Sequence, residues 1–135
     1  MKYVLALMTA LLLNATANLL MKLGMKSAAS SGGWFKEGAM GAASTVLTSL
    51  PLLIGLTCFI LNAAFYMYAL QSPALKISLA YPIMVGGGYA LIALVARLHP
   101  AWGERLTGGQ IAGVALVLAG IVLIASQTEP TPGPS

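Results

Sequence analysis

The sequence predicts an all-α membrane protein with four transmembrane helices, and two observations lead to this prediction. Of its 135 residues, 59% are hydrophobic and only 7% are charged, with a mean hydropathy of +0.88, whereas a soluble domain carries about 25% charged residues. The apolar residues also form stretches of about 20, the length that crosses a bilayer. We expect one domain, residues 1–126, with helices at about 3–22, 51–70, 77–96 and 106–126, a long loop at 23–47, and a disordered tail at 127–135.

The first predicted span, about 3–22, carries polar side chains on one side only. Asn14, Asn18 and Lys22 are spaced by four residues, so they stack on one helix face. Lipid cannot satisfy an amide, so this stripe should face a protein interior or a wet cavity. Two interpretations stay open. Either the asparagines only join helices, at about 0.6 to 2 kcal/mol each, or they also line a substrate path.

The connection at 23–47 is rich in Ser, Gly and Ala and contains Trp34, Phe35 and Lys36. Aromatic rings beside a lysine favour the headgroup level of a membrane, so we expect an interfacial anchor here. A short surface helix at about 39–48 would then lead into the second span.

The second predicted span, about 51–70, begins at Pro51, a residue that suits the first turn of a helix. Cys58, Asn62 and Tyr66 are again four residues apart and form a second, mildly polar stripe. This stripe either packs against the first helix or lines a cavity. Cys58 is the only cysteine, which excludes a disulfide within one chain.

The third predicted span, about 77–96, contains Pro82 and, one turn later, Gly86, Gly87 and Gly88. Proline removes a backbone hydrogen bond and kinks a helix, and each glycine lowers helix propensity by about 1 kcal/mol. The glycines therefore serve either close packing against another helix or a hinge.

The fourth predicted span, about 106–126, contains Gly109, Gly113 and Gly120, a pattern of small residues that lets two helix backbones approach closely. We expect the dimer seam here. The loop before it contains His99, but a lone loop histidine has no partner ligands, so no metal site is expected.

Three stretches follow one another along the chain: Leu20-Met21-Lys22, then Ala80-Tyr81-Pro82-Ile83, and then Gly103-Glu104-Arg105-Leu106, which leads into the apolar run from Gly113 to Leu123. In this order and spacing they resemble the small multidrug resistance family and its relatives in the drug/metabolite transporter superfamily. The resemblance spans nearly the whole chain apart from the 23–47 connection and the tail. It implies four helices, a dimer, a central chamber and alternating access.

The chain departs from this family at the position that matters most. Multidrug members bind cations and protons through a glutamate on the first helix, and Asn14 stands at the matching position here. The sequence contains no aspartate, and Glu37, Glu104 and Glu129 fall in predicted loops or the tail. Met84 stands where the family often has tryptophan. We therefore expect neither a counter-ion for a cationic drug nor a titrating group for proton exchange.

Lysines mark the predicted membrane edges: Lys22, Lys26 and Lys36 follow the first span, and Lys76 precedes the third. A substrate that matches this charge is anionic. The chain resembles the four-helix flippase subunits for undecaprenyl-phosphate-linked aminoarabinose, which also lack the acidic residue and share Ala-Tyr-Pro in the third span. This resemblance implies that lysines hold a phosphate; the alternative is that they only mark topology.

The predicted function is flippase-like translocation or export of an anionic amphiphile, such as a polyprenyl-phosphate-linked sugar, in the bacterial inner membrane. We expect contact with membrane lipid and a homodimer or a heterodimer with a related four-helix subunit, without cofactor, metal or nucleic acid. No cluster of acids, cysteines and histidines lies in the spans, so no enzyme is indicated. The alternatives are a drug or metabolite exporter with a partner subunit, and a non-transporting interaction subunit. The predicted substrate-binding residues are Asn14, Asn18, Lys22, Asn62, Tyr66, Lys76, Ser78 and Tyr81, with a hinge at Pro82, Gly86, Gly87 and Gly88 and a dimer seam at Gly109, Gly113 and Gly120.

Basic residues are distributed unevenly between the two sides that four spans create. Lys2 and Lys76 fall on the side of the termini, and the opposite side carries Lys22, Lys26, Lys36, Arg97 and Arg105. The positive-inside rule then puts the long loop in the cytoplasm and both termini outside. Such a bias favours a single orientation, and hence a parallel dimer or pairing with an inverted partner chain.

Overall fold

The computed structural model describes residues 1–30, 38–98 and 106–127, and each predicted span is a helix in it. The helices are α1 (Lys2–Ser30), α2 (Gly38–Thr48), α3 (Leu50–Ala69), α4 (Ile77–Leu98) and α5 (Gly108–Gln127). All except α2 are long and apolar enough to cross a membrane. The described residues contain no strand, so the predicted all-α, four-span fold class is confirmed.

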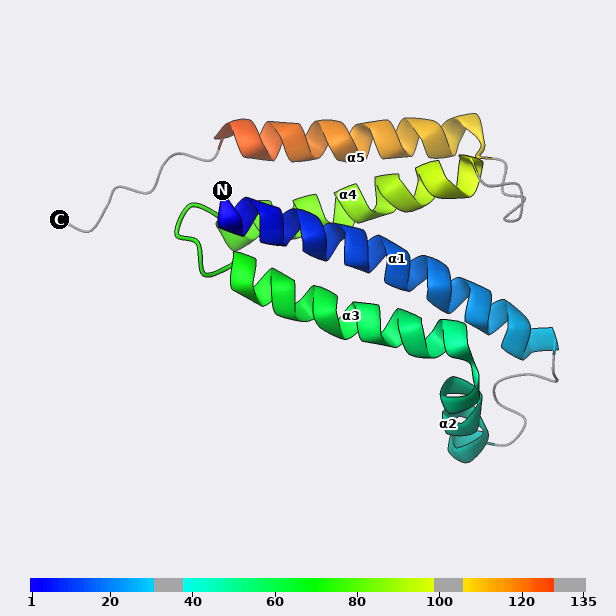
Figure 1. Cartoon of the computed structure of the whole chain (residues 1–135). Coiled ribbons are helices and arrows are strands. Elements are labelled where there is room, and N and C mark those ends of the chain that lie inside the picture. Colours follow the sequence, from blue (N-terminus) through cyan, green and yellow to red (C-terminus); the bar gives the residue numbers. More distant parts are fainter. Residues whose placement is uncertain (31–37, 99–105, 128–135) are drawn as a thin grey trace.

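Helix α1 is the centre of the bundle (Figure 1). It packs antiparallel to α3 on one side and parallel to α4 on the other, while α5 packs mainly on α4. The fully buried residues are small, among them Ala10, Ala17, Ala69 and Ala80. Small residues let membrane helices approach closely. At Gly55 the backbone of α1 is close, because a Cβ built there would lie 3.2 Å from the Ala17 carbonyl oxygen.

Helix α1 ends at Ser30, well beyond the predicted end near residue 22, so residues 23–30 of the expected loop at 23–47 are helical. The segment after Lys22 contains no proline and includes good helix formers. Its one glycine, Gly24, lies directly against the side chain of Leu52, so packing against α3 supports the extra turns. The 29-residue helix is about 43 Å long, more than the roughly 30 Å hydrocarbon core.

Helix α2 corresponds to the short surface helix expected at about 39–48, and it begins at Gly38, whose φ of +68° favours glycine. Pro51 lies in the first turn of α3, as predicted. Helix α5 starts later than expected because Thr107 and Gln110 form a capping box. The Thr107 backbone N–H donates to Gln110 Oε1 at 2.8 Å, and the Gln110 N–H donates to Thr107 Oγ1 at 3.4 Å.

Some predicted features lie outside the described residues. They include the interfacial anchor at Trp34, Phe35 and Lys36, the loop histidine His99, and residues 128–135 of the tail. Gln127, which we expected in that tail, is the last residue of α5.

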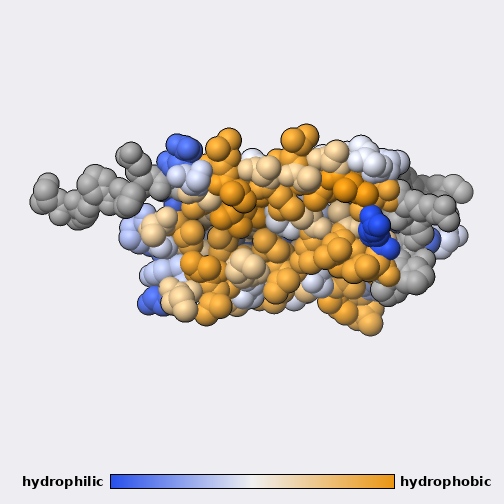
Figure 2. Space-filling model, turned by 90° about the horizontal axis from the view of Figure 1, so that it is seen from above, coloured by the Kyte–Doolittle hydropathy of each residue, from blue (hydrophilic) through white to orange (hydrophobic). Residues whose placement is uncertain are grey.

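Polar residues lie at the two ends of the bundle, and the middle of the surface shown in Figure 2 is mostly apolar. The N-terminus and the turn before α4 share one end (Figure 1), so Lys2 and Lys76 belong to that end. Lys22, Lys26 and Arg97 belong to the other end. The chain thus has an apolar middle and basic residues at both ends of the bundle, as expected of a protein that crosses a membrane repeatedly.

Candidate functional site

The polar stripe of α1 faces α4 through Asn14. A Cβ built at Gly88 would lie 2.9 Å from Nδ2 of Asn14, so this half-buried amide rests on the glycine of α4. Asn18 is exposed, and its Nδ2 donates to the Asn14 backbone oxygen at 2.8 Å and to Asn14 Oδ1 at 3.4 Å. These two bonds of Asn18 stay within α1, whereas Asn14 is placed where α1 meets α4.

The second stripe contains two buried polar atoms on α3. Asn62 is only 4% exposed, and neither its Oδ1 nor the Tyr66 hydroxyl has a hydrogen-bond partner within the described ranges. Such an orphan group destabilises a fold by about 1–3 kcal/mol. Asn62 also lies near the middle of its span, where lipid offers no replacement partner. These atoms are therefore candidates for contact with a polar ligand.

Tyr66 connects this stripe to the start of α4. Its ring packs against a cluster that includes Leu7 of α1 and Ala80 of α4. Tyr81 follows Ala80 in α4, and 56% of its surface is exposed. Ser78 is exposed one turn earlier. Tyr66 therefore packs near the start of α4, and a shared substrate site with Tyr81 stays a prediction.

The two lysines of the predicted site lie at opposite ends of the bundle. Lys76 precedes α4, and its carbonyl oxygen accepts hydrogen bonds from the N–H groups of Leu79 and Ala80, both at 2.9 Å. Because Leu7 and Ala80 share one cluster, Lys22 lies about 22 Å further along α1. Both side chains are exposed. Within one chain, Lys22 and Lys76 do not meet the same phosphate.

Each of the three adjacent glycines of α4 contacts a different side chain. A Cβ at Gly86 would lie 2.5 Å from Cδ1 of Ile121 on α5, and one at Gly87 would lie 2.6 Å from Cδ1 of Leu11 on α1. Gly88 meets Asn14, as described above. The geometry supports the close-packing interpretation of these glycines, and the hinge stays a prediction.

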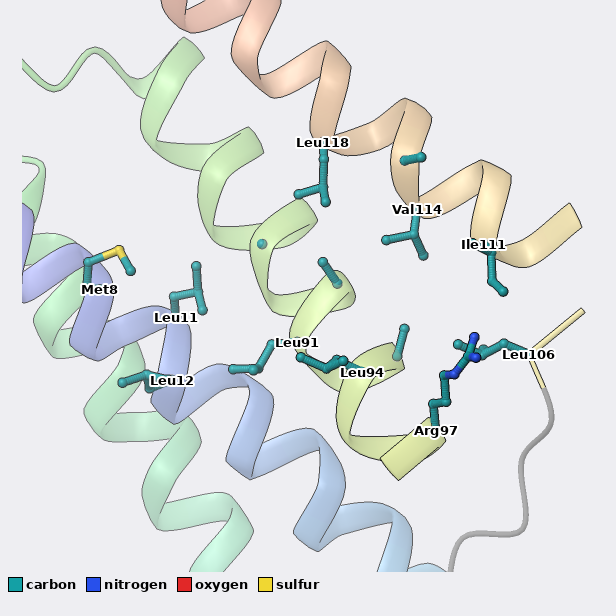
Figure 3. Close-up of a pocket in the computed structure, with 14 residues that line it drawn as sticks. Met8, Leu11, Leu12, Leu91, Leu94, Arg97, Leu106, Ile111, Val114 and Leu118 are labelled. Atoms are coloured by element: carbon teal, nitrogen blue, oxygen red, sulfur yellow. The ribbon is translucent and has the colours of Figure 1, made fainter. Parts of the chain in front are cut away.

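An apolar groove of about 620 Å³ lies between α1, α4 and α5 (Figure 3). Leu11 and Leu12 line it from α1, Leu91 and Leu94 from α4, and Val114 and Leu118 from α5. At one end the side chain of Arg97 extends toward Leu106. A volume of this size is typical of small-molecule sites.

Arg97 was not among the predicted site residues, because the sequence presents it only as a basic residue in the last turn of a span. Such a residue is usual at a membrane edge, where it faces the headgroups. The groove is built from three helices that are far apart in sequence. Only the packing of these helices shows that Arg97 lies at the end of the apolar groove.

A smaller hollow of about 410 Å³ lies where α1, α2 and α3 meet, and Ser27, Thr45, Thr48 and Ser49 contribute hydroxyls to it. The hydroxyl of Thr45 donates to the Gly41 carbonyl at 2.9 Å, and that of Thr48 donates to the Ser44 carbonyl at 2.8 Å. Two of these hydroxyl protons are therefore already committed to backbone carbonyls.

The glycines of the predicted dimer seam lie on an open face of α5. A Cβ built at Gly109, Gly113 or Gly120 meets no heavy atom within 4 Å in the described part of the chain. Helix α5 has no buried residue. This face has room for a second helix, and the dimer seam stays a prediction.

The chain is similar to bacterial membrane proteins. It is 38% identical over 86 residues to y4nH, an uncharacterized protein of Sinorhizobium fredii, which covers 63% of this chain and 68% of that protein. The chain belongs to the family of y4nH. No family model matches it, and no solved structure does.

Two further relatives of the chain have names that state a role. One is the probable 4-amino-4-deoxy-L-arabinose-phosphoundecaprenol flippase subunit ArnF of Aeromonas hydrophila, which is 38% identical over 78 residues. The other is the multidrug transporter PA4990 of Pseudomonas aeruginosa, which is 35% identical over 75 residues. The matches cover 56% of this chain in both cases, 51% of the ArnF protein and 64% of PA4990.

The chain therefore spans about half the length of the ArnF relative. Both named relatives are transport proteins, not enzymes, and they connect the chain to small transporter-like proteins. Together with the four spans, they identify a multi-pass protein of the bacterial inner membrane.

Proposed function

We propose that the chain translocates an anionic amphiphile, such as a polyprenyl-phosphate-linked sugar, across the inner membrane by alternating access. The observation that carries this proposal is Asn62, a buried amide near the middle of α3 whose Oδ1 accepts no hydrogen bond from the described residues. A sugar hydroxyl is a donor that would satisfy this oxygen during passage. The flippase name of the ArnF relative supports the same substrate class.

In this proposal the polar residues of α1, α3 and α4 line a chamber for the headgroup. Asn14 and Asn62 act near mid-membrane, and Tyr81 acts toward the end of the bundle that holds Lys76. Since Lys22 and Lys76 lie at opposite ends, each would meet the phosphate at a different membrane face. A second subunit, of this chain or of a related chain, would dock on the glycine face of α5. Contact with membrane lipid follows from the apolar outer surface.

A drug or metabolite exporter is the second candidate, and the observation that favours it is the similarity of the chain to the multidrug transporter PA4990. The spans contain no carboxylate, so a cationic drug would need a counter-ion from a partner subunit. The two candidates therefore differ in the charge of the molecule that moves.

Transport in proteoliposomes tests the proposal. The protein, purified with any subunit that accompanies it, should accelerate translocation of a fluorescent polyprenyl phosphate, and Asn62→Leu should abolish this activity. Thr57→Val is the matched control, because Thr57 is an exposed residue of α3 whose hydroxyl donates to the Leu53 carbonyl at 2.9 Å. Movement of a cationic dye without movement of the lipid would favour the exporter. If neither the lipid nor the dye is translocated, the remaining alternative is a non-transporting interaction subunit.

A further inference from the structure

The length of the apolar groove between α1, α4 and α5 matches the thickness of one membrane leaflet. Along α4 it extends from Gly87 to Arg97, ten residues of helix or about 15 Å. The hydrocarbon core of a bilayer is about 30 Å thick. The groove therefore starts near the middle of the membrane and ends near the headgroups.

The lining of this groove is apolar except at its outer end. Its described walls consist of leucine, isoleucine, valine, alanine, methionine and glycine, and among the described residues that line it only Arg97 has a charge or a hydrogen-bonding side chain. A cation at the headgroup end of a leaflet-deep apolar groove matches the charge pattern of a lipid with an anionic head.

The guanidinium of Arg97 is suited to a phosphate. It lies in the last turn of α4, is exposed, and extends toward Leu106 at the mouth of the groove (Figure 3). Guanidinium groups bind phosphate oxygens with two parallel N–H···O bonds, which ammonium groups do not. The exposed lysines at the bundle ends lack this geometry, and none of them lines the groove.

The groove is also separate from the predicted dimer seam. On α5 it is lined by Ile111, Val114, Ala115 and Leu118, whereas Gly109, Gly113 and Gly120 lie about half a turn away around the helix axis. A second subunit at the glycine face would therefore leave the groove accessible to lipid.

We propose that this groove binds the hydrocarbon tail of a polyprenyl phosphate and that Arg97 binds its phosphate headgroup. The inference rests on the proposed function and deepens it, because it assigns the phosphate to an arginine at one membrane face. It places the tail between α1, α4 and α5, outside the chamber formed by the asparagines.

Lipid binding measured on the purified protein in detergent tests this site, with undecaprenyl phosphate and undecaprenol as probes that share one tail. The wild type should bind the phosphate form more tightly. Arg97→Gln should weaken binding of undecaprenyl phosphate about tenfold or more, which corresponds to about 1.4 kcal/mol, and should change undecaprenol binding little. Lys26→Gln is the matched control, since it removes one exposed positive charge from the same end of the bundle and should leave both affinities within about twofold.

A second pair of variants tests the tail. Ala115→Phe fills the groove and should weaken both probes, whereas Ala112→Phe adds the same ring to an exposed position of α5 that does not line the groove and should not. Equal effects of Arg97→Gln and Lys26→Gln would overturn the headgroup assignment. If millimolar inorganic phosphate competes with the lipid, free phosphate and not a lipid headgroup is the ligand of Arg97, and the proposed lipid site is overturned. A spontaneous disulfide dimer of Ala115→Cys in a Cys58→Ala background would show that a second copy occupies the groove.

The outcome is separable from that of the proposed function. Arg97-dependent lipid binding without translocation in proteoliposomes would remove the transport proposal and keep the site. Translocation with binding that does not depend on Arg97 would remove the site alone.

Discussion

Replacing Asn62 with leucine is expected to stabilise the protein while abolishing its transport activity. The two side chains are similar in size, so the substitution removes a buried amide without opening a cavity. The side chain is 4% exposed and its Oδ1 lacks a partner in the described residues, so the amide oxygen has lost its solvation without a hydrogen bond in return. A gain in stability on removing a polar group is the signature of a residue kept for function.

The size of the gain follows from two opposing effects. A buried polar group without a partner is unfavourable by about 1–3 kcal/mol, and a hydrophobic swap at nearly constant volume costs less than about 1.5 kcal/mol. We expect a net stabilisation of about 1 kcal/mol, roughly a fivefold shift in the unfolding equilibrium.

Unfolding in mixed micelles of a mild detergent and dodecyl sulfate, followed by circular dichroism, measures this change. Thr57→Val should alter the free energy of unfolding by no more than about 0.5 kcal/mol, because it is an exposed substitution. If Asn62→Leu instead destabilises the protein by 1 kcal/mol or more, the amide has a partner in the folded protein, and Asn62 is a structural connector.

Three further predictions follow from the helix contacts and the charge distribution. Substrate binding should vary little between about pH 5 and 8, the range in which a carboxylate with a raised pKa would titrate, because Asn14 has no titratable group. Asn14→Glu should introduce a pH dependence of binding. A steep pH dependence in the wild type that persists in Asn14→Ala would contradict this prediction. If the glycines form a hinge, Gly87→Ala should keep assembly and binding but slow transport, since the added methyl meets only the flexible end of Leu11; loss of assembly would favour packing alone. Labelling of cysteines from outside intact cells, introduced at Ser31 and separately at Ser135 in a Cys58→Ala background, should modify only the C-terminal site, and equal labelling would show insertion in both orientations.

The four spans were predictable because each is a nearly continuous apolar stretch of the length that a bilayer requires. Their ends were less so. Helix α1 continues to Ser30 because the side chain of Leu52 covers Gly24, a contact between residues on different helices. Helix α5 starts at Gly108 because of the reciprocal bonds of Thr107 and Gln110. This capping box is visible in the sequence as a threonine followed three residues later by a glutamine.

The candidate site was only partly predictable for a similar reason. Four-residue spacing correctly places Asn14 with Asn18 and Asn62 with Tyr66 on shared faces, since helix periodicity alone decides this. Spacing does not tell which neighbour each face meets. The structure pairs Asn14 with Gly88 of α4 and leaves the Oδ1 of Asn62 unpartnered within the described ranges. It also separates Lys22 from Lys76, a distance that depends on the parallel packing of α1 and α4.

Helix α5 shows how these features bear on assembly. Its contact with α4 is held at Gly86, where Ile121 and Val117 would meet any added Cβ. The face with the predicted seam and the face that lines the groove lie on opposite sides of this helix. A subunit that docks on the glycines would shield the α4–α5 pair from lipid on one side only. Each subunit of such a dimer would then keep its own tail groove and its own Arg97, while the buried amides of α1 and α3 remain inside the bundle. Because the apolar groove and the polar chamber share α1 and α4, a lipid that keeps its tail in the groove would have its headgroup beside the chamber.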